Sequence, residues 1–137
     1  SANKGIPPQE LKNAASGGEF SRLMLCIKYI LADKTALPTI IFDEIDTGIS
    51  GEVAIKVGKM MKQMAKNHQV ISISHLPQIA AQGNSHYYVF KDNSSEKTIS
   101  KMKLLTPAER VTEIAQMIGG EKPSETAVMS AKELLEL

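Results

Sequence analysis

The feature that most constrains this chain is an apolar run that ends in acidic residues and then in a Gly/Ser turn. Pro38 precedes the run, and residues 40–42 are β-branched or aromatic, a composition typical of a short buried strand. Asp43, Glu44 and Asp46 follow it within four positions. Carboxylates at the carboxyl end of a strand lie where open α/β sheets bind their ligands. The stretch therefore predicts a strand with a candidate metal or nucleotide site at its end, and a plain acidic surface turn is the alternative.

Composition and charge limit the partners that this chain can have. Its 137 residues are expected to form a single domain, residues 1–137, and the apolar fraction of 42% is ordinary for a globular chain. A net charge of +1 provides no bulk attraction to nucleic acid or to a membrane. Any DNA contact is therefore expected to be local or to lie outside this chain. Because the first residue is Ser, we expect the chain to begin inside a larger protein.

The cellular compartment is predicted from cysteine usage and from apolar runs. Cys26 is the single cysteine, which excludes a disulfide framework and a cysteine metal cluster and fits a reducing compartment. No apolar run approaches the roughly 20 residues of a membrane span, and no signal-peptide pattern is present at the N-terminus. We expect a cytoplasmic protein without membrane contacts.

Hydrophobic periodicity predicts an alternation of strands and helices along the chain. Strands are expected over 40–42, 69–74, 86–91 and 98–104, the last two joined by a polar turn as a hairpin. Helices are expected from Ser16 to Ala32, where the helix is apolar nearly all round, and over 51–67, 77–82, 106–118 and 124–137. The apolar spacing of three and four places Val53, Val57, Met60, Met61 and Met64 on one face of the helix over 51–67. Thr106 with Glu109 matches a capping box. The order predicts an α/β fold, with a mainly parallel sheet flanked by helices and a small β-hairpin.

Two further features accompany the acidic strand end. Ser16, Gly17, Gly18 and Glu19 stand at the start of a helix, and Ser16 with Glu19 matches a capping box. Two glycines at a helix start also leave backbone N–H groups and the positive end of the helix dipole open to an anion. His75 directly follows the second predicted strand. Each feature alone is weak, but their order and spacing together suggest one phosphate-binding constellation.

Other polar residues receive structural interpretations. We expect Cys26 to lie in the core, because free cysteine behaves as a small apolar residue. His68 and His86 are expected as surface or edge histidines. Arg22 lies one turn past the two glycines and is either a phosphate ligand or an ordinary helix-surface residue.

In order and spacing, these features resemble the C-terminal half of an ATP-binding-cassette (ABC) ATPase head. Residues 15–19 resemble the signature motif, residues 40–44 the Walker B strand with its catalytic Glu, residues 45–50 the D-loop, and His75 the switch histidine. Glu19 is the form used by chromosome-maintenance (SMC) and double-strand-break-repair heads, and Ile45 stands where transporters usually carry Pro. Over almost its whole length the chain is similar to the RecN family of SMC-like bacterial DNA repair proteins.

The resemblance implies ATP hydrolysis with Mg²⁺, and it implies a role for each residue at the two strand ends. Asp43 is expected to hold Mg²⁺ through a water molecule, since that ion prefers hard oxygen ligands. Glu44 is expected to orient or deprotonate the attacking water. His75 is expected to hydrogen-bond the γ-phosphate. These three contacts position the reacting groups, which is most of what phosphoryl transfer requires.

The resemblance also implies partners. Ser16, Gly17, Gly18 and Glu19 are expected to clamp the γ-phosphate of an ATP held mainly by a second subunit, and Asp46 is expected at the dimer interface. The complete protein is then a homodimer through its heads that engages DNA ends or single-stranded regions. A cytoplasmic, nucleoid-associated location is expected, again without a membrane.

A P-loop is missing from the sequence. The motif requires Gly-x-x-x-x-Gly-Lys-Ser/Thr, and the nearest stretch has Val53 in place of the first Gly and Met60 after Gly58 and Lys59. No long heptad run for a coiled-coil arm is present either. We therefore expect the C-terminal lobe of a head that lacks its P-loop half and does not hydrolyse ATP alone.

Two other functions remain open for this sequence. One is the nucleotide-binding subunit of an ABC transporter, and the other is a non-catalytic α/β interaction domain. Whether the ends of the strands that carry Asp43 and Ser74 lie side by side separates these functions. Catalysis requires them to lie side by side, and it is excluded if Glu44 and His75 face different surfaces.

Overall fold

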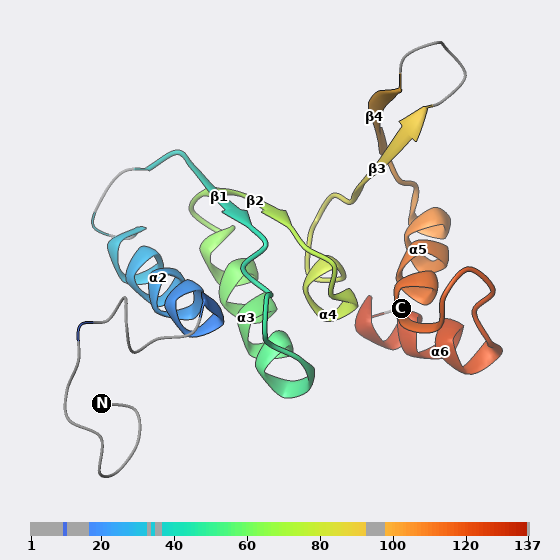
Figure 1. Cartoon of the computed structure of the whole chain (residues 1–137), viewed down its shortest axis with the longest axis horizontal. Coiled ribbons are helices and arrows are strands. Elements are labelled where there is room, and N and C mark those ends of the chain that lie inside the picture. The colour runs from blue at the N-terminus through green and yellow to red at the C-terminus, as the bar shows by residue number, and fades with distance from the viewer. Residues whose placement is uncertain (1–9, 11–16, 33, 35–36, 93–97, 137) are drawn as a thin grey trace. The chain divides into compact units, whose positions relative to one another are not determined.

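The computed structural model describes residues 10, 17–32, 34, 37–92 and 98–136 (Figure 1). The elements are α2 (Gly17–Ala32), β1 (Thr39–Asp43), α3 (Gly51–Met64), β2 (Gln69–Ile73), α4 (Pro77–Ala80), β3 (Tyr87–Asp92), β4 (Ile99–Leu104), α5 (Pro107–Gly119) and α6 (Glu125–Leu134). They form two compact units, Ser1–Leu76 and Pro77–Leu137. The predicted order of strands and helices is confirmed.

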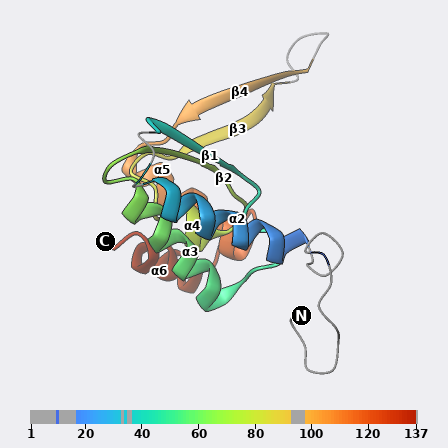
Figure 2. The same cartoon turned by 90° about the vertical axis from the view of Figure 1, so that its left-hand side faces the viewer.

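The first unit is built on a two-stranded parallel sheet. β1 pairs with β2 in a register that places Thr39 opposite Gln69 and Asp43 opposite Ile73. Both α2 and α3 lie on one face of this sheet (Figures 1 and 2). Alternate side chains of a strand point to opposite faces, so β1 buries Ile40 and Phe42.

The other face of the sheet is uncovered in the described part of the chain. Ile41 is 57% exposed, and its neighbours on β2, Ile71 and Ile73, are 43% and 55% exposed. Parallel sheets are normally covered on both faces. The prediction of a buried strand is therefore correct for one face of β1 and wrong for the other.

Helix α2 also differs from expectation. The sequence predicts a helix buried nearly all round, but α2 buries Leu25 and Ala32 and leaves a row of large apolar side chains exposed. The exposed ones are Phe20, Leu23, Ile27, Ile30 and Leu31. Cys26 is exposed as well, so its predicted place in the core is wrong. Only part of the helix surface is covered by the described residues of this unit.

Helix α3 follows its predicted pattern more closely. Its buried residues include Val57, Met61 and Met64, as the spacing of three and four predicts. Val53, expected on the same face, is 47% exposed. It lies in the first turn of the helix, which begins at Gly51.

The second unit contains the predicted hairpin and a small helical core. β3 and β4 pair antiparallel, with Tyr87 opposite Leu104, and residues 93–97 of the predicted turn lie outside the described part. His86 is half-buried just before β3, and this burial, helped by the charge of Arg110, lowers its pKa. The core gathers small and aliphatic residues from the α4–α6 region: Ala81, Ile114, Ala115 and Ala131, with Val111, Val128 and Leu134 packed against them.

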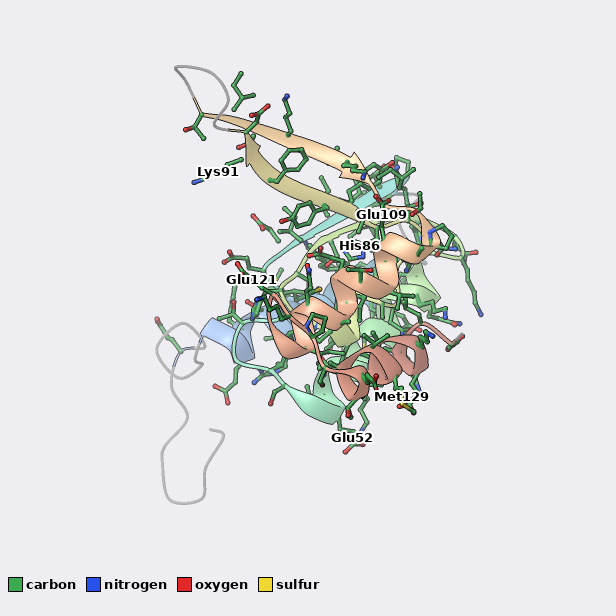
Figure 3. All side chains as sticks on the ribbon, turned by 90° about the vertical axis from the view of Figure 1, so that its right-hand side faces the viewer. Glu52, His86, Lys91, Glu109, Glu121 and Met129 are labelled. Atoms are coloured by element: carbon green, nitrogen blue, oxygen red, sulfur yellow. The ribbon has the colours of Figure 1, made fainter. Side chains whose placement is uncertain are left out.

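A capping box begins α5, as the sequence predicts. Thr106 Oγ1 accepts a hydrogen bond from Glu109 N at 3.3 Å, and Thr106 N donates to Glu109 Oε2 at 2.8 Å. Figure 3 shows Glu109 at this end of the helix. A hydrogen bond from Lys103, together with those from Thr106, lowers the pKa of Glu109 to about 2. No helix in the described ranges has the length and apolar content that a membrane span requires.

Thr106→Ala should lower the free energy of unfolding by about 1 kcal/mol, because it removes the side-chain cap of α5. Urea denaturation followed by circular dichroism measures this loss. Thr112→Ala is the matched control, since Thr112 lies inside the same helix and its hydroxyl contacts Ala108 O, where alanine is the better helix former. Equal stabilities of the two variants would contradict a stabilising cap.

Candidate functional site

The two predicted strand ends lie side by side. β1 and β2 run parallel with Asp43 opposite Ile73, and Glu44 N donates to Ile73 O at 3.2 Å, which extends the pairing by one residue. Asp43 and Glu44 are exposed, and the His75 side chain is 68% exposed. Carboxylates and an imidazole therefore emerge at the same edge of the sheet, the arrangement that catalysis requires.

The turn after β1 folds back toward β2. Thr47 N and Oγ1 donate to Glu44 O at 3.3 and 3.0 Å, and Ile49 N donates to Asp46 O at 3.2 Å. Glu44 has φ +48°, a left-handed conformation, and Gly48 has φ +73°. For a residue with a Cβ this conformation costs roughly 1–2 kcal/mol. The strained residue is the predicted catalytic carboxylate, and strain of this kind gathers at functional sites.

Asp46 is buried at the centre of this turn. Its side chain is 0% exposed, and Oδ2 accepts from Ser74 Oγ at 2.6 Å and from His75 N at 2.9 Å. His75 Nδ1 lies 3.1 Å from the same oxygen. Burial raises the pKa of Asp46, but the hydrogen bonds from Ser74 and His75 outweigh it and hold the pKa below the ordinary value.

The carboxylate of Asp46 contacts its own chain. The family resemblance implies a place for Asp46 at a dimer interface, and within this chain its side chain bonds to Ser74 and His75. The reason is that the turn returns to β2, where Ser74 and His75 supply hydrogen-bond donors that offset the cost of burying a charge. Ser74 is part of the site and was missed by sequence reasoning, since a Ser after a strand carries no signal of its own.

The glycine-rich helix start packs against the same turn. A Cβ on Gly18 would lie 2.6 Å from Thr47 O, and Arg22 Nη1 would lie 3.2 Å from it. Glycine is needed here for a close approach of backbones, a reason separate from anion binding. The sequence leaves two roles open for Arg22, a phosphate ligand or a helix-surface residue. Its guanidinium lies beside Gly18 at the start of α2. Ser16 lies outside the described residues, Gly17 begins α2, and Glu19 is exposed in its first turn.

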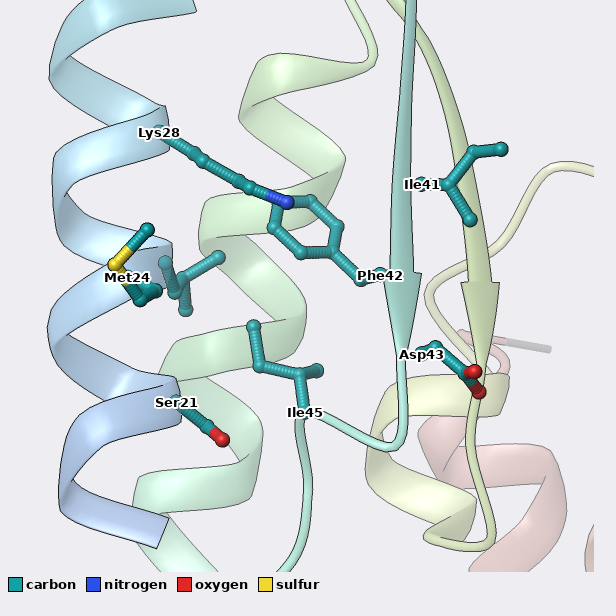
Figure 4. A pocket seen from close by; sticks show the side chains of 8 residues that line it. Ser21, Met24, Lys28, Ile41, Phe42, Asp43 and Ile45 are labelled. Carbon is teal, nitrogen blue, oxygen red and sulfur yellow. The ribbon is translucent and has the colours of Figure 1, made fainter. Parts of the chain in front are cut away.

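A small pocket lies between α2 and β1 next to the site (Figure 4). It is lined by Ser21, Met24, Leu25, Lys28, Ile41, Phe42, Asp43 and Ile45. The Lys28 ammonium lies 5.3 Å from the centre of the Phe42 ring, a cation–π distance. The lining mixes apolar side chains with Ser21, Lys28 and Asp43, and the contact between Lys28 and Phe42 is one of helix-to-strand packing.

Asp43 is the predicted ligand of a hard cation. Within the described ranges no cluster of three or more His, Cys, Asp or Glu side chains could hold a metal ion. A cation at Asp43 would have one protein carboxylate, with water and phosphate at its other positions. Mg²⁺ takes such an arrangement, because it keeps several waters and is bound through one or two carboxylates and substrate phosphates.

Curated relatives match nearly the whole chain. The DNA repair protein RecN of Haemophilus influenzae is 44% identical over 136 residues, which are 99% of this chain and 24% of that protein. The DNA repair protein RecN of Vibrio cholerae is 42% identical over 135 residues, which are 98% of this chain and 24% of that protein. The chain spans about a quarter of the length of the curated relatives it matches. No family model matches the chain.

Solved structures share the fold. A structure from work on the ATP-driven dimerization and DNA-stimulated activation of SMC ATPases matches with a TM-score of 0.61 at 23% identity, covering 88% of this chain and 70% of that chain. The SMC head domain of Thermotoga maritima matches with a TM-score of 0.55 at 22% identity, covering 74% of this chain and 37% of that chain. The predicted fold class, part of an SMC-type α/β head, is confirmed.

Gly18→Ala should destabilise the chain by on the order of 1–3 kcal/mol, because its Cβ forces Thr47 O away from α2. Urea denaturation measures the loss. Cys26→Ala, an exposed change on the same helix, should stay within about 0.5 kcal/mol of the parent. A Gly18→Ala chain as stable as the control would mean that the close approach to Thr47 is not required.

Glu44→Gly should be more stable than Glu44→Ala by about 1 kcal/mol, since both remove the carboxylate but only glycine relieves the positive φ. The same pair of changes at Glu52, in the first turn of α3, should show the opposite order because alanine is the better helix former. Denaturant midpoints of the four variants provide the comparison. An identical order at both positions would show that Glu44 is not strained.

Proposed function

We propose that this chain, a RecN-type sequence, is the C-terminal part of an SMC-like ATPase head that acts in DNA repair. The observation that carries the proposal is the pairing of β1 with β2, which brings Asp43 and Glu44 to the same sheet edge as His75. The similarity to RecN proteins along nearly the whole chain supports it. In this proposal residues 1–137 act together as one half of the head.

The residues at the strand ends would divide the work of ATP hydrolysis. Asp43 would hold Mg²⁺ through a water, and the ion when bound would neutralise charge on the phosphates. Glu44 would orient the attacking water and accept its proton. His75 would hydrogen-bond the γ-phosphate from the neighbouring strand end. All three side chains are exposed, so a nucleotide can reach them.

A second copy of the head would complete the site. Ser16, Gly17, Gly18 and Glu19 would clamp the γ-phosphate of an ATP bound mainly to that copy, through backbone N–H groups at the start of α2. The turn that carries Asp46 would lie near the dimer interface, although the Asp46 carboxylate itself contacts its own chain. The structural match to an SMC ATPase from work on ATP-driven dimerization supports this arrangement.

Most of the DNA contact would lie in other parts of the protein. The net charge of +1 offers little attraction to phosphate backbones. We therefore propose that parts outside this chain bind DNA ends or single-stranded regions in the cytoplasm, at the nucleoid. A transporter subunit is not favoured, because the curated relatives are RecN proteins and Ile45 replaces the usual proline of transporters.

The chain alone should not hydrolyse ATP, because its sequence has no P-loop to hold the phosphates. A chimera in which it replaces the matching quarter of Haemophilus influenzae RecN should hydrolyse ATP with saturation kinetics. In that chimera Glu44→Gln should reduce kcat at least about a hundredfold and accumulate ATP-dependent dimers. Phosphate release and size-exclusion chromatography with ATP provide the two measurements.

Glu52→Gln is the control, because Glu52 is an exposed carboxylate paired with Lys56 on α3 and should leave turnover unchanged. Saturable hydrolysis by the chain alone would contradict the division of the site between two parts of the protein. Unimpaired turnover in Glu44→Gln, or monomers throughout, would rule out Glu44 as the base.

A further inference from the structure

We propose that Ser74 is a positioning residue for His75, because its hydroxyl joins the buried Asp46 carboxylate to the backbone after β2. Ser74 Oγ donates to Asp46 Oδ2 at 2.6 Å and accepts from Leu76 N at 3.1 Å. His75 lies between Ser74 and Leu76 in the chain, so the two contacts fix the point at which it leaves the sheet edge. The effect on catalysis rests on the proposed function, whereas the contacts themselves are independent of it.

The backbone after β2 is held by one connected set of hydrogen bonds. β2 ends at Ile73, and the next residues are bound through the turn after β1 instead. His75 N donates to Asp46 Oδ2 at 2.9 Å, and the same oxygen accepts from the Ser74 hydroxyl. A hydroxyl can donate one hydrogen bond and accept another at the same time. Ser74 therefore connects the carboxylate with Leu76 N, and none of these bonds involves the imidazole.

Burial makes the Ser74 hydroxyl important to the carboxylate. The Asp46 side chain is 0% exposed, and Oδ1 has no hydrogen-bond partner in the described part of the chain. A buried carboxylate with few donors depends strongly on each of them. Burial raises the pKa of Asp46, and the hydrogen bond from Ser74 is the largest of the contributions that lower it. Loss of this hydroxyl should therefore weaken the hold of Asp46 on the residues after β2.

The bond joins the two segments that carry the proposed catalytic groups. Asp46 lies two residues after Glu44, and Ser74 directly precedes His75. Both Glu44 and His75 are exposed, so the backbone from which each side chain emerges decides which groups it can reach. Phosphoryl transfer depends mainly on such positioning. Loss of the Ser74 hydroxyl should therefore slow turnover more than it weakens ATP binding.

The contacts are tested in the chain itself by Ser74→Ala. Carboxyl ¹³C titration should show an Asp46 pKa below the ordinary value in the parent chain and a raised pKa in Ser74→Ala. Amide hydrogen exchange at Leu76 should become at least about fivefold faster, because its acceptor is lost. Ser72→Ala is the matched control, since Ser72 is an exposed serine on β2, and it should leave both measurements unchanged. Ser74→Thr keeps a hydroxyl and should restore both.

Turnover is measured in the RecN chimera. Ser74→Ala should lower kcat at least about tenfold while the KM for ATP changes less than about threefold. Ser72→Ala should retain the kcat of the parent chimera. Ser74→Thr should recover most of the kcat that Ser74→Ala loses.

Several results would overturn the role of Ser74. An ordinary or raised pKa of Asp46 in the parent chain does so even if Ser74→Ala fails to fold. Unchanged Asp46 pKa and Leu76 exchange in a folded Ser74→Ala chain also overturn it, as does an unchanged kcat in the active chimera. An inactive parent chimera would instead contradict the proposed ATPase, and the measurements on the chain would still decide whether Ser74 holds this segment.

Discussion

The site depends on the parallel pairing of β1 with β2 and on one buried carboxylate that links the turn after β1 to the residues after β2. Pairing brings residues 43 and 73 opposite each other, and Asp46 then joins this turn to Ser74 and His75 by hydrogen bonds of 2.6 and 2.9 Å. The Asp46 side chain is 0% exposed, and the two hydrogen bonds to Oδ2 offset part of the cost of burying its charge, while Oδ1 has no hydrogen-bond partner among the described residues. These hydrogen bonds hold together the segments after β1 and β2, next to the exposed residues Asp43, Glu44 and His75.

Glycine contributes to the same construction in two ways. Gly18 lets the start of α2 approach Thr47 O at a distance that no side chain would allow, and Gly48 has a positive φ that turns the loop back. The motif that resembles an anion-binding helix start is thus also a packing element. Glu44 has a positive φ without being glycine, and that cost is consistent with a carboxylate retained for chemistry rather than for stability.

The exposed apolar surfaces fit a chain that spans a quarter of its relatives' length. Ile41, Ile71 and Ile73 form one uncovered sheet face, and the row from Phe20 to Leu31 lies along α2. Parallel sheets are usually covered on both faces. The sequence likewise contains a signature-like motif, a Walker B-like strand and a switch-like histidine without a P-loop motif.

Local pattern was sufficient to predict the elements, and tertiary packing decided how the side chains are used. Periodicity and turn residues predicted the strands, the hairpin, the helices and the Thr106 capping box, because these depend on neighbours within a few positions. The burial of Cys26, Val53 and most of α2 was predicted wrongly, since burial depends on what packs against an element. For the same reason the sequence indicated Asp46 as a site residue but did not predict which groups its carboxylate contacts. Only the return of the turn to β2 placed its carboxylate against His75, because two residues so far apart in the chain meet through the sheet register.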